Sequence, residues 1–141
     1  MTIGLITITH NRIGAQITET AETILGPPPF AIRHFAIGPD DDPERMERQV
    51  VQAISEIDTG DGVLIVSDLY GSTPCNIARR VSSAHRVRVV SGINLPMMFR
   101  IFGYGAIGLD EITRKALDGG RIGVVECDSP VETAGQQASG S

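Results

Sequence analysis

Cysteine and positive charge are scarce in this sequence, and each shortage argues against a class of protein. The 141 residues include two cysteines, Cys75 and Cys127. Two are too few for a disulfide framework, and they lack the CxxC or Cys/His spacing of a metal site. Lys and Arg number 12 against 17 acidic residues, for a net charge of −5. That balance argues against a protein that coats DNA or RNA, so we expect no nucleic-acid partner.

Long apolar runs are also missing. The N-terminal segment MTIGLITITH reaches His10 after one short apolar run with no basic residue before it, unlike a secretory signal peptide. No later segment approaches the roughly 18 apolar residues that a membrane span requires. We therefore expect a cytoplasmic protein. Hydrophobic residues make up 41% of the chain and charged residues 21%, which is typical of a globular domain.

Short apolar strands alternate with amphipathic helices along the chain. Apolar and β-branched runs predict strands at 3–9, 30–37, 63–66, 87–90 and 123–127. Apolar residues at helical spacing predict helices at 13–25, 43–57, 74–81, 97–102 and 109–117. Because each strand needs a crossover helix to reach a parallel neighbour, the pattern predicts an α/β fold with a mainly parallel open sheet flanked by helices.

The chain shows no internal repeat and no linker. We expect one domain over residues 1–127, followed by a flexible C-terminal tail over residues 128–141. Gly119 and Gly120 should end the last helix before the final strand.

Three loops follow the carboxyl ends of predicted strands, at residues 10–12, 68–74 and 92–96. In open parallel sheets, ligands bind beyond these ends, where the strand order reverses. The three loops converge if the first, third and fourth strands are neighbours in the sheet.

His10 ends a buried strand, where its imidazole would be partly shielded and partly accessible. An imidazole attacks a phosphoryl group through one nitrogen when the other carries a proton, and a carboxylate that accepts this N–H stabilises the resulting cation. Asp68 also ends a strand and is the candidate carboxylate. The same loop contains Gly71, Ser72 and Thr73, whose amides and hydroxyls suit phosphate oxygens at a helix start, with Thr73 as the expected N-cap.

His10, Asp68 and other candidate residues also have purely structural interpretations. A single histidine after a strand is often a turn or capping residue, and an aspartate before a glycine-rich loop is often a turn former. His34 lies within an alternating strand, where a structural role is favoured. Cys75 has no second cysteine or base beside it in the sequence and is expected to pack in the core. The Met and Phe residues at 97–102 are typical of a core, or of a dimer face.

The residues predict no metal site. Asp40–Asp42 lacks the ligand spacing of an EF-hand and is typical of a helix N-terminus, with Asp42 as the N-cap and Pro43 at the first position. The run of Gly71, Ser72 and Thr73 lacks the lysine of a P-loop, which argues against nucleotide hydrolysis.

Three motifs, each following a predicted strand, together resemble a known family. They are Ile8-Thr9-His10, DLYGSTPCN at residues 68–76 and GINLPM at residues 92–97. In this order they resemble the mannose-family enzyme IIA domain of the bacterial phosphoenolpyruvate-dependent sugar phosphotransferase system, over about residues 1–127. The resemblance implies a phosphotransferase in which His10 is phosphorylated, Asp68 orients the histidine and Thr73 helps to hold the phosphoryl group.

The resemblance also implies partners. It makes the phosphocarrier protein HPr the phosphoryl donor. Because no long linker to a fused enzyme IIB domain follows, we expect a separate enzyme IIB or a regulatory protein as acceptor. The resemblance further implies a homodimer that exchanges the strand at 123–127, no metal or organic cofactor, and membrane association only through a transporter complex.

Two residues depart from the family pattern. Asn11 stands where a glycine usually follows the active histidine, and asparagine tolerates a positive φ better than most residues, so the turn should survive. Ser72 stands where a second glycine is common in sugar-transport members, and it adds a donor or narrows the site.

Other functions remain open from the sequence. The phosphotransfer subunit of dihydroxyacetone kinase shares the fold and the histidine chemistry. A non-enzymatic anion- or protein-binding module of flavodoxin-like architecture would never form phosphohistidine. A hydrolase is disfavoured, because Ser72 and Thr73 have no general base other than His10 and no nucleophile elbow.

Overall fold

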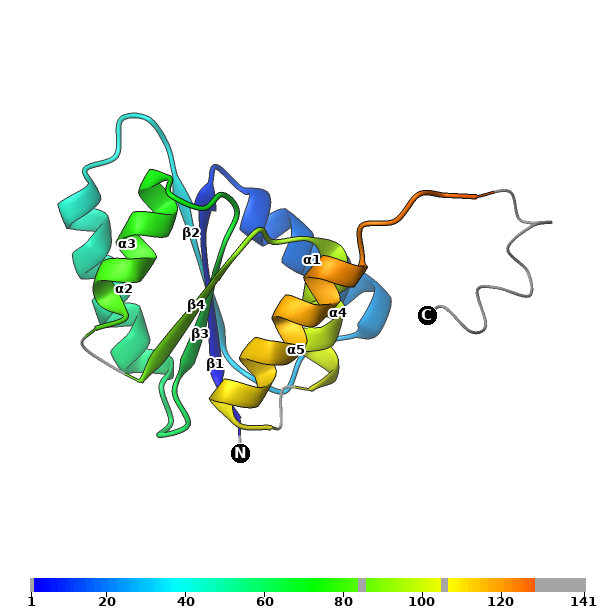
Figure 1. Cartoon of the computed structure of the whole chain (residues 1–141). Helices are drawn as coiled ribbons and strands as arrows, with labels where there is room; N and C mark the ends of the chain where they lie inside the picture. Colours follow the sequence, from blue (N-terminus) through cyan, green and yellow to red (C-terminus); the bar gives the residue numbers. More distant parts are fainter. Residues whose placement is uncertain (1, 84–85, 105–106, 129–141) are drawn as a thin grey trace.

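The computed structural model describes residues 2–83, 86–104 and 107–128 (Figure 1). Its elements are, in chain order, β1 (Gly4–His10), α1 (Ile13–Leu25), β2 (Ile32–Ile37), α2 (Pro43–Ile57), β3 (Val63–Ser67), α3 (Thr73–Val81), β4 (Val87–Ser91), α4 (Leu95–Gly103) and α5 (Leu109–Ile122). This is the predicted α/β fold. Residues 129–141, which make up most of the predicted tail, lie outside the described part.

The strands form one parallel sheet in the order β2-β1-β3-β4. The first, third and fourth strands are therefore neighbours, as convergence of their loops requires. β1 and β3 lie in the centre because their apolar runs are buried on both faces. His10 pairs with Ile37 of β2, and Ile8 pairs with Ser67 of β3, so these strands end at nearly the same level.

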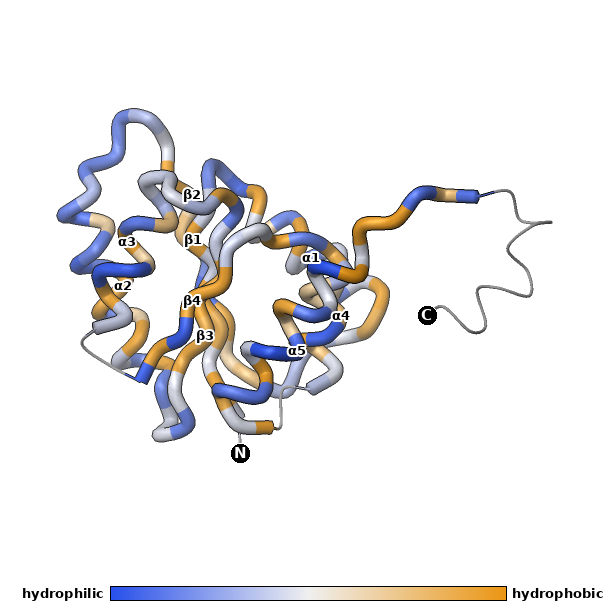
Figure 2. The backbone as a smooth tube through the Cα atoms, in the orientation of Figure 1, coloured by the Kyte–Doolittle hydropathy of each residue, from blue (hydrophilic) through white to orange (hydrophobic). Residues whose placement is uncertain are grey.

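Helices cover both faces of the sheet. Figure 1 shows α2 and α3 on one side and α1, α4 and α5 on the other. Leu5 of β1 packs in the core under α1, α4 and α5, whereas Ile6 packs in the core under α2 and α3. Figure 2 shows apolar residues gathered along the strands and polar residues on the outer helix surfaces. The carboxyl end of β1 is thus anchored by a core on each side.

Helix α2 begins and ends as the sequence predicts. The carboxylate of Asp42, its N-cap, accepts a hydrogen bond from the Glu44 N–H at 3.2 Å, and Pro43 is the first helical residue. Its buried face consists of Val50, Ala53, Ile54 and Ile57.

Helix α1 buries only part of the apolar stripe that the sequence predicts at residues 13, 17, 21, 24 and 25, since Ala21 is buried and Ile17 packs against the core. Ile13, Ile24 and Leu25 remain 41%, 57% and 48% exposed. The buried residues are small, namely Gly14, Thr18 and Ala21. The reason is close packing against β1, where a side chain at position 14 would collide with Thr7.

The C-terminal prediction was wrong within the single chain. α5 continues through Gly119 and Gly120 to Ile122, because both glycines are buried and pack against α4, where tertiary contact outweighs their low helix propensity. The predicted strand at 123–127 has no regular secondary structure. β4 is the edge of the described sheet, and no described segment pairs with residues 123–127. Exchange of this segment in a dimer stays a prediction.

Among the described residues, no helix combines the length and the apolar character that crossing a membrane takes.

Gly14→Ala should destabilise the fold, because the added Cβ meets the Cβ of Thr7 at 2.6 Å on a buried strand. We expect the free energy of unfolding to fall by about 1–3 kcal/mol, measured by urea denaturation. Gly103→Ala is the matched control, since a Cβ at this last residue of α4 meets open space. Equal urea midpoints for the two variants would contradict the close approach of α1 to β1.

Candidate functional site

His10 and Asp68 meet at the carboxyl ends of the two central strands. His10 is the last residue of β1, and Asp68 directly follows β3. His10 Nδ1 lies 2.8 Å from Asp68 Oδ2. The backbone N–H of His10 donates to the same oxygen at 3.1 Å. The structure thus brings together the predicted histidine and its predicted carboxylate.

This contact fixes which ring nitrogen is free. An ionised carboxylate only accepts hydrogen bonds, so Nδ1 carries the proton and donates it to Asp68. His10 Nε2 has no hydrogen-bond partner among the described residues. The His10 side chain is 43% exposed and that of Asp68 is 11% exposed. The arrangement therefore combines a sheltered carboxylate with an accessible nitrogen whose lone pair is available.

Asp68 directs its charge toward the ring. Its other oxygen, Oδ1, is buried and has no hydrogen-bond partner among the described residues. The side-chain and backbone N–H groups of His10 are thus the donors that the described structure provides to this carboxylate. A positive charge that develops on the ring would be stabilised by a carboxylate in a poorly solvated position.

Asn11 makes the turn that follows the histidine. Its φ is 48°, in the left-handed region that asparagine tolerates, as the sequence analysis expects. The Asn11 N–H donates to the Ile37 carbonyl at 3.1 Å. The replacement of glycine by asparagine is therefore compatible with the turn.

A hollow of about 460 Å³ opens beside His10. Its walls come from the β1–α1 turn, the β2–α2 loop and the start of α3, as His10, Asn11, Ile37, Gly38, Pro39, Asp41, Pro43, Thr73 and Pro74. Thr73 is thus brought into the same hollow as His10. Gly71 and Ser72 do not line it.

The start of α3 differs by one residue from the prediction. The N-cap is Ser72, and Thr73 is the first helical residue. Ser72 makes no capping bond; its hydroxyl instead donates to the Leu69 carbonyl at 2.6 Å, which closes the turn after β3. Thr73 is exposed, so its hydroxyl is accessible beside an amino-terminal helix turn with unpaired N–H groups.

The sequence patterns did not identify one wall of the hollow. The β2–α2 loop, residues 38–42, also follows a strand end, and this signal was available. Its importance depends on β2 lying next to β1, which the sequence did not reveal. By contrast, the predicted loop at 92–96 does not line the hollow. Its Gly92 and Ile93 N–H groups donate to the Ser67 carbonyl at 3.0 and 3.1 Å, joining the ends of β3 and β4.

The acidic residues of the β2–α2 loop have local structural roles. Asp41 accepts the Gly38 N–H at 2.7 Å, and Asp42 caps α2. Among the described residues, no group of three or more His, Cys, Asp or Glu side chains is placed to hold a metal ion.

His34 lies apart from the residues that line the hollow. Its Nδ1 is 2.6 Å from the buried Thr7 hydroxyl. Burial is the main cause that lowers the pKa of His34 below its usual value, while the negative charge of Glu19 opposes the shift. These contacts agree with the structural role expected for this histidine.

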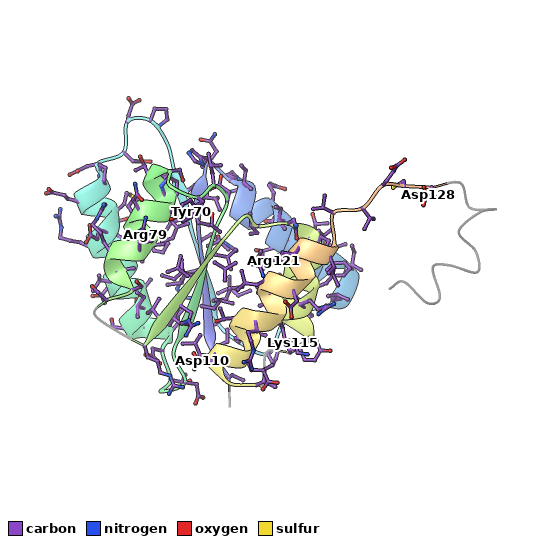
Figure 3. The ribbon with its side chains drawn as sticks, in the orientation of Figure 1. Tyr70, Arg79, Asp110, Lys115, Arg121 and Asp128 are labelled. Atoms are coloured by element: carbon purple, nitrogen blue, oxygen red, sulfur yellow. The ribbon has the colours of Figure 1, made fainter. Side chains whose placement is uncertain are left out.

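The loop after β3 also exposes large side chains next to the site. Leu69 and Tyr70 are 60% and 75% exposed. The Arg79 guanidinium carbon lies 5.8 Å from the centre of the Tyr70 ring, and Figure 3 shows both residues at α3. Leu69 and Tyr70 directly follow Asp68 in the chain, and neither is among the residues that line the hollow.

The chain is similar to components of one bacterial system. Residues 4–114 match the family model described as the PTS system fructose IIA component, where PTS denotes the phosphotransferase system. The PTS system mannose-specific EIIAB component of Escherichia coli (strain K12) is 30% identical over 138 residues, which cover 95% of this chain and 42% of that protein. The chain therefore spans less than half the length of this relative.

Solved structures show the same fold. The mannose/sorbose specific IIA subunit from Enterococcus faecalis superposes with a TM-score of 0.82 at 25% identity, covering 92% of this chain and 98% of that one. The phosphotransferase system component EIIA from Streptococcus agalactiae gives a TM-score of 0.78 at 19% identity, covering 88% and 96%.

The Asp68 contact predicts the tautomer of His10. At a pH where the ring is neutral, the proton should reside on Nδ1 in the native protein and move largely to Nε2 in Asp68→Ala, because the carboxylate that accepts from Nδ1 is gone. Long-range ¹H–¹⁵N spectra of the imidazole distinguish the two forms. Asp41→Asn, which alters another carboxylate of the hollow, should leave the tautomer unchanged; a native Nε2–H form would contradict the assignment.

Proposed function

The chain belongs to the mannose family of enzyme IIA components of the phosphotransferase system, and we propose that His10 accepts a phosphoryl group from phosphorylated HPr. The hydrogen bond between His10 Nδ1 and Asp68 carries this proposal. It leaves Nε2 as the nucleophile, on a side chain that lines the hollow. The protein is then a phosphocarrier, an enzyme that forms a phosphohistidine and has proteins as its substrates.

The transfer is an in-line displacement at phosphorus. The lone pair of His10 Nε2 forms the new N–P bond while the N–P bond of the donor phosphohistidine breaks, and the donor nitrogen keeps that electron pair. His10 keeps its Nδ1 proton throughout. The ring gains positive character as the bond forms, and Asp68 stabilises it through the 2.8 Å hydrogen bond.

Thr73 is the best placed group for the phosphoryl oxygens. Its hydroxyl and backbone N–H lie at the start of α3, where the helix dipole favours negative charge. We also propose the backbone N–H of Gly71, whose φ is 81°, as a second donor to the phosphoryl oxygens from the same loop. Both the hydroxyl and the N–H of Ser72 donate to the Leu69 carbonyl, so we assign Ser72 to closing this turn.

Protein partners would cover the exposed Leu69 and Tyr70 beside His10. Aromatic and arginine side chains are favoured at the centres of protein interfaces, and the Tyr70–Arg79 pair offers both. We propose HPr as the donor and an enzyme IIB or a regulatory protein as the acceptor. The name of the Escherichia coli relative, an EIIAB component, supports an enzyme IIB acceptor. With these partners, we propose that the protein acts in the cytoplasm and associates with the membrane only through a transporter complex.

Incubation with phosphoenolpyruvate, enzyme I and HPr should place an acid-labile, alkali-stable phosphoryl group on the protein. His10→Ala should abolish labelling, whereas His34→Ala should keep it. Thr73→Ala should slow labelling by about 10²-fold through loss of one oxyanion donor, and Thr73→Ser should restore most of the rate.

The outcomes of this labelling assay distinguish the proposed function from its alternatives. A folded native protein that stays unlabelled would favour the binding-module alternative. A labelled His10→Ala variant would move the site elsewhere. Label that passes to enzyme IIB would separate this function from that of a dihydroxyacetone kinase subunit.

We also propose that the chain forms a homodimer by exchange of residues 123–127. The segment leads away from the body of the chain in Figure 1, and its Val124 and Val125 are 80% and 73% exposed. β4 presents an unpaired strand edge within the described structure. An exchanged segment would bury these valines and satisfy that edge.

Val124→Glu combined with Val125→Glu should shift the protein from dimer toward monomer, because two charges would enter the proposed apolar contact. Sedimentation velocity measures the change. Glu126→Gln, on the same segment but without loss of apolar surface, is the control and should stay dimeric. A native protein that sediments as a monomer would overturn the exchange.

A further inference from the structure

Helix α1 begins without a cap from its own N-terminus. The side chain of Arg12, its N-cap residue, makes no capping hydrogen bond, and the first turn contains no acidic residue. The N–H of Gly14 is instead bonded to the Thr9 hydroxyl oxygen at 2.9 Å. Thr9 belongs to β1 and is 1% exposed. This buried strand residue therefore accepts the hydrogen bond that an N-cap side chain would otherwise accept.

The same hydroxyl holds the turn that follows His10. Thr9 Oγ1 donates to the Asn11 carbonyl at 3.3 Å while it accepts from the Gly14 N–H. One buried oxygen therefore connects the left-handed residue of the turn with the first turn of α1. Other contacts fix the N–H groups of the turn, to Asp68 and Ile37, but only Thr9 binds the Asn11 carbonyl within the described structure.

We propose that Thr9 is a positioning residue for His10. Its hydroxyl holds the Asn11–Arg12 peptide, one residue beyond the histidine, and so restrains the turn that determines how the imidazole approaches Asp68 and the hollow. A valine at this position fills the same volume but removes both hydrogen bonds and leaves the buried Gly14 N–H without a partner. A misplacement of about 1 Å at a reacting group costs up to about 10²-fold in rate.

This inference rests on the proposed phosphoryl transfer, and a kinetic comparison tests it. Thr9→Val should lower kcat for phosphorylation by phospho-HPr by about 10- to 100-fold with little change in KM, since Thr9 is buried away from the partner surface. Thr9→Ser, which keeps the hydroxyl, should recover kcat to within about threefold. Thr9→Cys provides a milder loss of the hydroxyl if the valine variant does not fold, with an intermediate kcat.

Thr113→Val is the matched control. Thr113 is also buried, and its hydroxyl donates to the Leu109 carbonyl at 2.7 Å within α5, which contributes no residue to the hollow. It should lose stability without loss of kcat. An unchanged kcat in Thr9→Val, or an equal loss in Thr113→Val, would overturn the positioning role.

Imidazole spectra separate this inference from the proposed function. Thr9→Val should weaken the bond between Nδ1 and Asp68, seen as faster exchange of the Nδ1 proton, whereas Thr113→Val should not. If the native protein takes no phosphoryl group but Thr9→Val still loosens the ring, the phosphocarrier function fails and the positioning contact stands. An Nδ1 proton that exchanges at the native rate in Thr9→Val refutes the positioning contact.

Discussion

The hydrogen bond between His10 Nδ1 and Asp68 Oδ2 is the interaction on which the account of this protein depends. It exists because two parallel strands, adjacent in the sheet, end at nearly the same level, with Ile8 beside Ser67. Both strands are buried on both faces, so the register is fixed by two apolar cores. The packing of helices on both faces of the sheet therefore holds the His10 imidazole against the Asp68 carboxylate.

Local hydrogen bonds refine what the sheet positions. Thr9 ties the turn after His10 to α1, and Ser72 closes the turn after Asp68. Both hydroxyls act on backbone groups, which leaves the exposed hydroxyl of Thr73 available to a ligand. The site thus divides into a rigid frame and a few accessible groups, His10 and Thr73 among them.

The sequence predicted the four strands of the sheet and their parallel direction, and it named Asp68 as the partner of His10 on condition that the first and third strands are neighbours. It did not predict that Gly14 and Thr18 of α1 are buried while Ile13 and Ile24 stay exposed, since that depends on how closely Gly14 approaches β1. Nor did it predict that α5 passes through Gly119 and Gly120, which requires knowledge of their contact with α4. The local sequence pattern predicts which segments form strands and helices. The close packing of glycines and the β2–α2 wall of the hollow depend instead on which elements are neighbours in the folded protein.

Asp68 accepts the hydrogen bond from His10 Nδ1, and the lone pair of Nε2 is therefore available to attack phosphorus. The most direct test is the ¹⁵N spectrum of the phosphorylated protein, prepared with ¹⁵N-labelled histidine and examined for ³¹P–¹⁵N coupling. We expect coupling on Nε2 of His10, while Nδ1 keeps its proton. Coupling on Nδ1, or on another histidine, would contradict it.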